Sequence, residues 1–183
     1  MKNKDDYKLI SSEVMYEGNV VQVRHDVIEL ENGVVANRDV VCHPGGVGIA
    51  LEDDDGKFFM VKQFRYAIQE ETLEFPAGKI ENNEDPLEAA KREIIEETGY
   101  EGEGFIPLGK IVPTPAYDNE VIHIFYAKKG LFLGQNLDED ESLNTLTMGF
   151  EDISQEIRAG NIVDAKTIGM MQLIQAYKEK EDE

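Results

Sequence analysis

Three glutamates and one arginine stand close together in the segment "REIIEE", residues 92–97. Glu93, Glu96 and Glu97 are spaced i, i+3 and i+4, so on an α-helix their carboxylates share one face within a single turn. Like charges at this spacing repel, by roughly a few tenths of a kcal/mol for an exposed pair. A divalent cation removes that repulsion, because Mg²⁺ and Mn²⁺ prefer carboxylate oxygens as ligands. The spacing therefore predicts a metal site on a helix, and a solvated acidic helix is the alternative.

The helix that must present these carboxylates is predicted over residues 86–98. Asp85 offers an N-cap and Pro86 suits the first helical position. Glu88 completes a capping box, and Gly99 stands where the helix should end. The opposite face is expected to dock on a sheet through its less polar residues, Leu87, Ala90, Ile94 and Thr98.

The glutamates belong to a longer pattern with the spacing G-x5-E-x7-R-E-x-x-E-E-x-G. Its fixed positions are Gly78, Glu84, Arg92, Glu93, Glu96, Glu97 and Gly99. This pattern is the Nudix box, and the sequence resembles a Nudix hydrolase over nearly its whole length. The resemblance implies an α/β class protein: a Nudix α/β/α sandwich with a mixed sheet, preceded by N-terminal antiparallel strands. It also implies cleavage of a diphosphate linked to another group, assisted by Mg²⁺ or Mn²⁺.

The resemblance also assigns roles to the residues of the box. It implies that Glu93 and Glu97 ligate the metal, often with Glu96 and the main-chain carbonyl of Ala77. Arg92 is expected to orient the glutamates through ion pairs and hydrogen bonds rather than to touch the metal. Glu96 and Arg92 are therefore candidates for the catalytic machinery as well.

Stretches outside the box resemble the ADP-ribose pyrophosphatase branch of the family. They are "QFRY" (63–66), "EFPAGKI" (74–80) and "DAKTIGMMQL" (164–173), and the N-terminal pair of strands adds to them. Pro115, sixteen residues after Gly99, matches a further marker of that branch. The implied reaction converts ADP-ribose to AMP and ribose 5-phosphate.

Two other functions stay open from the sequence. A GDP-mannose or other nucleoside-diphosphate-sugar pyrophosphatase uses the same core and is the alternative within the enzyme class. A non-catalytic ADP-ribose or nucleotide sensor is the alternative of another class. Such sensors tend to lose box glutamates, and this chain keeps all of them.

Five residues outside the box are candidates for substrate binding. Arg65 is a candidate phosphate ligand, since its planar fork binds two oxygens, and a surface salt bridge is the alternative. Gln63 belongs to the same stretch, and Glu74 either binds metal or ribose or only holds its loop. Tyr117 follows Pro115 in the loop "PTPAYDNE", where the branch often has "SPGFSDE". Its ring is a candidate for stacking on a substrate ring, with packing as the alternative.

A water nucleophile needs a general base, and in the resembled branch this is commonly a glutamate on a loop after the box. The run "LDEDESLNTL" occupies that place. Glu141 is the first candidate and Glu139 the second. An acidic solvent loop is the alternative for both.

Composition narrows the range of partners. A formal net charge of -20 opposes binding to nucleic acid, whose affinity for proteins comes mostly from Lys and Arg. The single cysteine, Cys42, excludes an internal disulfide, and the start of the chain lacks the apolar run of a signal peptide or membrane span. We therefore expect a cytoplasmic protein with no membrane partner.

Strand signals surround the box. Residues 19–30 and 34–43 form a predicted hairpin at Asn32-Gly33. Residues 1–43 resemble a strand segment that exchanges between two subunits in the ADP-ribose pyrophosphatase branch, so we expect a homodimer. A hairpin folded on its own core is the alternative. Residues 44–183 are expected to form the Nudix domain. Further strands are predicted at 47–52, 57–65, 72–78, 105–113, 120–128 and 142–148, and helices at 150–159 and from Asp164 onward. Four residues of the last helix are predicted to form a packed face: Met170, Leu173, Ile174 and Tyr177.

Overall fold

The computed structural model describes residues 7–137 and 143–181. Within it the chain divides into two compact units. One contains the residues up to Gly45 together with Val112–Glu120, and the other contains Gly46–Ile111 and the residues from Val121 onward. No helix in the described part of the chain is long and apolar enough to cross a membrane.

The larger unit is built on a seven-stranded mixed sheet. Its main strand order is β10-β5-β4-β9-β8, with β6 paired to β5 and β7 paired to β4. The pairing of β4 with β9 is parallel, and the other pairings are antiparallel. The strands are β4 (Gly46–Glu52), β5 (Phe58–Arg65), β6 (Glu70–Glu74), β7 (Ala77–Lys79), β8 (Tyr100–Ile111), β9 (Ile122–Phe132) and β10 (Leu143–Met148).

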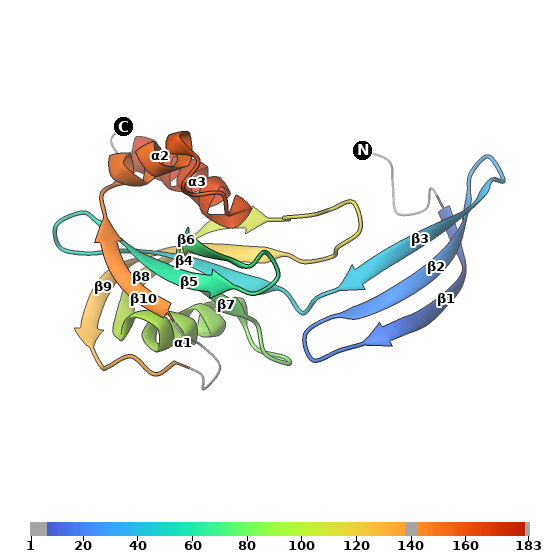
Figure 1. Cartoon of the computed structure of the whole chain (residues 1–183), viewed down its shortest axis with the longest axis horizontal. Coiled ribbons are helices and arrows are strands. Elements are labelled where there is room, and N and C mark those ends of the chain that lie inside the picture. The colour runs from blue at the N-terminus through green and yellow to red at the C-terminus, as the bar shows by residue number, and fades with distance from the viewer. Residues whose placement is uncertain (1–6, 138–142, 182–183) are drawn as a thin grey trace. The chain divides into compact units, whose positions relative to one another are not determined.

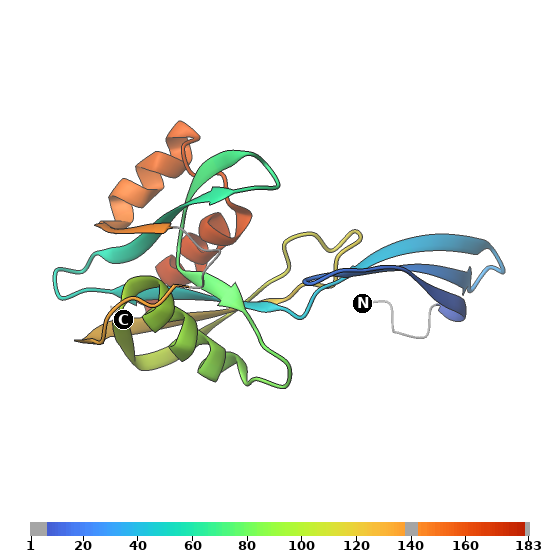
Figure 2. The same cartoon turned by 60° about the horizontal axis from the view of Figure 1, so that its bottom comes forward.

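Helices cover both faces of this sheet. The helix α1 (Pro86–Thr98) lies on one face, and α2 (Phe150–Ala159) and α3 (Ala165–Glu181) lie on the other (Figure 1, Figure 2). Every residue of β4 is buried, as expected for a strand covered on both faces. Its side chains alternate between two cores: Ile49 packs with Ile94 of α1, and Ala50 packs with Met170 of α3.

The smaller unit contains a three-stranded antiparallel sheet in the order β1-β2-β3. Its strands are β1 (Tyr7–Glu17), β2 (Gln22–Leu30) and β3 (Val35–Cys42). The sequence indicated the β2–β3 hairpin but not β1. Register shifts between Leu9 and Ser11 and between Val14 and Tyr16 interrupt the period-two alternation by which a strand is recognised in a sequence.

The predicted α/β class, with its mixed sheet, three helices and N-terminal antiparallel strands, is confirmed. The helix predicted over 86–98 has those bounds, and Met170 and Ile174 of the last helix are buried, with Leu173 and Tyr177 packed against them. One strand prediction is wrong in detail. The single strand expected over 72–78 is two strands, β6 and β7, because Pro76 has no N–H for a sheet ladder and lies between them.

Candidate active site

The ends of α1 are fixed by local hydrogen bonds. The Asp85 side chain accepts a hydrogen bond from the N–H of Leu87 at 2.9 Å. Gly99 ends the helix with a φ of 79°, a left-handed conformation that favours glycine. The predicted capping-box role of Glu88 is replaced by an ion pair with Lys91 at 2.7 Å. These caps fix where the helix begins and ends.

Arg92 is the centre of a carboxylate cluster formed by α1 and the segment that precedes it. Its Nε and Nη2 each donate to one oxygen of Glu84 at 3.0 Å, a bidentate pair. Its Nη1 donates to Glu93 at 2.8 Å and to Glu96 at 2.9 Å, and its Nη2 also donates to the carbonyl of Lys79 at 3.0 Å. These hydrogen bonds raise the pKa of Arg92, with the Glu84 pair contributing most, and lower the pKa of Glu84. Arg92 thus makes ion pairs with three carboxylates, and its orienting role stays a prediction.

Two glutamates of α1 contact the short strand β7. Glu97 is only 3% exposed, and its Oε2 accepts a hydrogen bond from the N–H of Ala77 at 3.0 Å. The Glu93 carboxylate lies against Gly78, where an added Cβ would fall 1.8 Å from the Glu93 Cδ. The first glycine of the box is thus required by close approach, since any side chain at residue 78 would displace Glu93.

The donors at this face suit a hard divalent cation. This face carries the carboxylates of Glu93, Glu96 and Glu97 beside the main chain of Ala77, and Mg²⁺ and Mn²⁺ prefer oxygen ligands of this kind. Within residues 7–137 and 143–181, no three acidic, histidine or cysteine side chains are already grouped around a single metal position. Side chains must therefore rotate to bring the glutamates together around a cation. Arg92 already holds two of the carboxylates, Glu93 and Glu96, close to each other.

Arg65 and Glu74 form a second charged group beside the box. Arg65 Nε and Nη2 donate to the two oxygens of Glu74 at 2.8 and 2.6 Å, and Thr72 donates to the same carboxylate at 2.6 Å. Burial alone would raise the pKa of Glu74, but Arg65 and the ammonium of Lys166 lower it to about 2. The pKa of Arg65 is raised by Glu74 first and in part by the charge of Glu97, which places this pair within electrostatic range of the box.

The sequence interpretation gave no individual roles to three residues at the start of α3. Lys166 and Thr167 bind the main chain of Phe75, two residues before Ala77, and Asp164 binds both of them. In the sequence, these residues stand out only as part of the stretch that resembles the ADP-ribose pyrophosphatase branch. Two charged residues and one hydroxyl residue at the start of a helix are the available signal, but their partner lies more than ninety positions away.

The candidate general bases Glu141 and Glu139 lie outside the described residues. The chain on both sides of them is described, and both sides contact α1. Gln135 Nε2 and Thr145 Oγ1 donate to the carbonyl of Glu97 at 2.5 and 3.1 Å. Gln63, half-buried on β5, is the register partner of Leu143, the first residue described after the gap.

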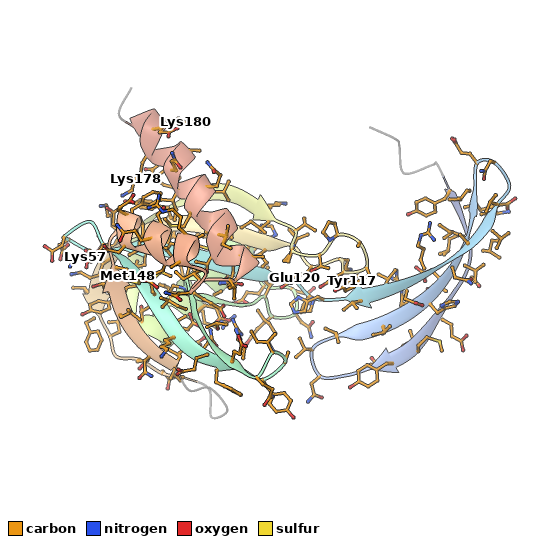
Figure 3. The ribbon with its side chains drawn as sticks, turned by 45° about the horizontal axis from the view of Figure 1, so that its top comes forward. Lys57, Tyr117, Glu120, Met148, Lys178 and Lys180 are labelled. Carbon is orange, nitrogen blue, oxygen red and sulfur yellow. The ribbon has the colours of Figure 1, made fainter. Side chains whose placement is uncertain are left out.

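Pro115 and Tyr117 belong to the smaller unit, within the loop Val112–Glu120 (Figure 3). The loop is held by main-chain hydrogen bonds to β3: Val41 donates to the Tyr117 carbonyl at 2.7 Å and accepts from Asn119 at 3.1 Å. The Tyr117 side chain is 57% exposed. Its ring is thus available to a ligand, and its predicted role stays a prediction.

Comparison with known proteins identifies the family. A family model described as the NUDIX domain matches residues 43–167. The chain belongs to the Nudix family. It is 37% identical over 171 residues to the methanol dehydrogenase activator of Bacillus methanolicus, covering 92% of each chain. It is 34% identical over 177 residues to the ADP-ribose pyrophosphatase of Bacillus subtilis, covering 96% of this chain and 95% of that protein.

The Nudix fold is also supported by a solved structure. The structure described as that of an ADP compounds hydrolase superposes with a TM-score of 0.87, covering 99% of this chain and 98% of the other. At 20% sequence identity this similarity establishes the fold alone. The predicted resemblance to a Nudix hydrolase of the ADP-ribose pyrophosphatase branch is confirmed.

Proposed function

We propose that this Nudix protein hydrolyses the diphosphate bond of ADP-ribose to AMP and ribose 5-phosphate. The observation that carries the proposal is the complete box, in which Arg92 gathers glutamates of α1 against β7. Similarity to the Bacillus subtilis ADP-ribose pyrophosphatase over nearly the whole chain supports this substrate.

The glutamates and Ala77 form the proposed metal site. Glu93 and Glu97, with Glu96 and the carbonyl of Ala77, would hold Mg²⁺ or Mn²⁺. When bound, the cation would neutralise charge on the diphosphate and its leaving group. Arg92 would keep Glu93 and Glu96 in place, and the part-buried hydrogen bond from Ala77 to Glu97 joins β7 to α1. A cation also explains how a protein of net charge -20 binds an anion.

Arg65, Gln63 and Glu74 form the proposed substrate side of the same unit. Arg65 is half-exposed while its Nε and Nη2 are held by buried Glu74, so the guanidinium is presented in a fixed orientation. A fixed guanidinium loses less entropy when it binds a phosphate. Pro115 and Tyr117 are proposed to contact the substrate from their loop.

Glu141 is the proposed general base, with Glu139 as the second choice. The contacts of Gln135 and Thr145 with the Glu97 carbonyl support this assignment, because they hold both flanks of the acidic run at the end of α1. Glu141→Gln should leave Mn²⁺ binding intact and lower turnover at least about a hundredfold. A near-normal rate would move the role to Glu139 or into the box.

We propose a cytoplasmic homodimer that pairs through the N-terminal strands. Support comes from β1, all of whose residues are exposed, including the large apolar side chains of Leu9, Ile10, Met15 and Tyr16. Apolar side chains on an edge strand are normally covered by another chain or element. Sedimentation at micromolar concentration tests this, and a monomer would contradict it.

A substrate panel tests the proposed reaction. ADP-ribose, GDP-mannose, other nucleoside-diphosphate sugars and dinucleoside polyphosphates would each be incubated with Mg²⁺, and released monophosphate would be measured. We expect the highest kcat/KM for ADP-ribose. A higher value for GDP-mannose would establish the alternative pyrophosphatase, and tight ADP-ribose binding without turnover would establish the sensor.

A second candidate function is activation of a dehydrogenase. It is favoured by 37% identity to the methanol dehydrogenase activator over 92% of both chains. The test compares the rate of a methanol dehydrogenase with and without this protein, and with Glu97→Gln in its place. Activation by the wild type but not by Glu97→Gln would show that activation depends on the hydrolase site. No activation by either protein would reject the activator function and keep the hydrolase.

A further inference from the structure

The segment between β6 and β7 leads directly into the strand that Glu97 contacts. Phe75 is fully buried, and Pro76 has no N–H, so the chain leaves the sheet ladder between Glu74 and Ala77. Buried main-chain groups outside a ladder must find other partners. The partners of Phe75 therefore act together with the pairing of β7 to β4 in fixing where Ala77 and Gly78 lie.

The first turn of α3 supplies both partners of Phe75. The N–H of Phe75 donates to Thr167 Oγ1 at 3.1 Å, and Lys166 Nζ donates to the Phe75 carbonyl at 3.1 Å. Asp164 Oδ2 accepts from Thr167 Oγ1 at 2.7 Å and lies 3.2 Å from Lys166 Nζ. We call these three residues, Asp164, Lys166 and Thr167, the α3 clamp.

The hydrogen bonds continue from Phe75 to the box. The Pro76 carbonyl accepts from Ile49 of β4 at 2.9 Å, and the Ala77 N–H donates to Glu97 at 3.0 Å. At Gly48, the register partner of Ala77, an added Cβ would lie 2.9 Å from the Met170 sulfur of α3. Glycine at residue 48 therefore lets α3 lie close to β4 at the point where β4 pairs with β7.

A contribution to stability is a weak explanation for the charged residues of the α3 clamp. Lys166 is only 7% exposed, and its three N–H groups face three acceptors: the Phe75 carbonyl, Asp164 and, at 3.3 Å, Glu74. Buried ion pairs can often be replaced by apolar residues without loss of stability. Such ion pairs do fix geometry. An ammonium that contacts three acceptors holds the main chain at Phe75 in one position.

We propose that the α3 clamp holds the Ala77 main chain against Glu97 and thereby sets the affinity of the site for its divalent cation. The inference rests on the proposed metal-dependent function. Asp164, Lys166 and Thr167 are positioning residues, because they act through Phe75. They lie on the sheet face opposite to α1, so their substitution leaves the box residues themselves unchanged.

The test compares Thr167→Val with Thr167→Ser. Valine has nearly the shape of threonine but neither donates to Asp164 nor accepts from Phe75, whereas serine keeps the hydroxyl. Binding of Mn²⁺ to the metal-stripped protein would be measured by electron paramagnetic resonance, alongside the Mg²⁺ concentration for half-maximal hydrolysis. We expect Thr167→Val to weaken both about 10- to 100-fold and Thr167→Ser to remain near wild type.

Tyr126→Phe is the matched control for stability. It removes a buried hydroxyl that donates to Glu52 at 2.6 Å, at the end of β4 away from β7. Unchanged Mn²⁺ binding in Thr167→Val, or an equal loss in Tyr126→Phe, would overturn the inference. If Thr167→Val does not fold, Asp164→Ala against Asp164→Asn makes the same comparison, since the amide can still accept from Thr167.

The two proposals fail in different ways. Mn²⁺ binding that depends on the clamp, in a protein that hydrolyses none of the substrates, would reject the hydrolase and keep the clamp. Hydrolysis of ADP-ribose with a normal metal requirement in Thr167→Val would keep the hydrolase and reject the clamp.

Discussion

The two ends of β4 both hold buried acids, but the described cations are arranged differently around them. At the end away from β7, Glu52 accepts from Tyr126 at 2.6 Å and lies 3.2 and 3.3 Å from the ammonium groups of Lys178 and Lys128. Lys178, labelled in Figure 3, also covers the ring of Phe58. Burial would raise the pKa of Glu52, yet the Tyr126 and Lys178 hydrogen bonds lower it.

At the end of β4 that pairs with β7, one cation contacts several carboxylates instead of several cations contacting one. There one guanidinium, Arg92, serves three carboxylates, those of Glu84, Glu93 and Glu96, and buried Glu97 adds a fourth acid. Glu52 shows that the fold can surround a buried acid with lysines where only structure is needed. The crowding of carboxylates around one guanidinium at the box supports the proposal that a cation completes the site. Substitutions at the two ends should accordingly have very different consequences.

The largest effect is expected for Glu97→Gln. The amide keeps the size of the side chain and an acceptor for Ala77, but it removes a charge that metal binding needs. Turnover of ADP-ribose should fall at least about a thousandfold, corresponding to several kcal/mol of lost charge stabilisation. Glu88→Gln on the exposed face of the same helix is the control and should remain near wild type. A loss below tenfold in Glu97→Gln would remove that residue from the metal site.

Arg92→Lys should have the next largest effect. An ammonium cannot make a bidentate pair with Glu84 and also reach Glu93, Glu96 and the Lys79 carbonyl. We expect a loss of about 10- to 100-fold in kcat/KM and a higher Mg²⁺ requirement. Lys91→Gln, one position earlier on the exposed side, is the control. Equal kinetics in Arg92→Lys and wild type would show that its fork geometry is unnecessary.

The sequence predicted the parts of this site that local rules govern. Asp85, Pro86 and Gly99 set the ends of α1, and the spacing of the glutamates set their common face. It did not predict the α3 clamp, because Thr167 and Lys166 meet Phe75 through tertiary contacts across more than ninety residues. It missed β1 for a different reason, since two register shifts hide the alternation of that strand.

The salt bridge of Arg65 shows a third limit. The sequence left open whether this residue binds phosphate or forms a salt bridge. The structure shows a bidentate pair with Glu74, which depends on the pairing of β5 with β6 and on the burial of Glu74 by α3. Neither is visible in the local sequence, and the pair does not exclude a phosphate ligand on the same guanidinium.

The pH dependence of stability should reveal the Glu74 pair. The pKa of the Glu74 carboxyl is lowered from 4.5 to about 2, so folding favours its ionised form. The stabilisation is therefore fully present above the unfolded pKa and is lost as the pH falls from about 4.5 toward 2. The difference in unfolding free energy between wild type and Glu74→Gln, measured by urea titration, should narrow over this range. A constant difference would contradict the assignment.

The smallest effect on activity is expected at the end of β4 that holds Glu52. Tyr126→Phe removes one hydrogen bond to Glu52 and should cost about 1 kcal/mol, or about 2–4 °C in Tm. The rate of hydrolysis should not change, because Lys178 and Lys128 still neutralise Glu52. Calorimetry and kinetics on the same preparation check both statements. A fall in kcat/KM comparable to that of Arg92→Lys would remove the distinction between the two ends.

The central claim is that the crowded glutamates require a cation to act on a diphosphate. The most direct measurement is the release of AMP from ADP-ribose by the metal-stripped wild type, before and after Mg²⁺ or Mn²⁺ is added. We predict no turnover in EDTA, full recovery with either cation, and equimolar AMP and ribose 5-phosphate. Turnover that persists in EDTA would contradict the account.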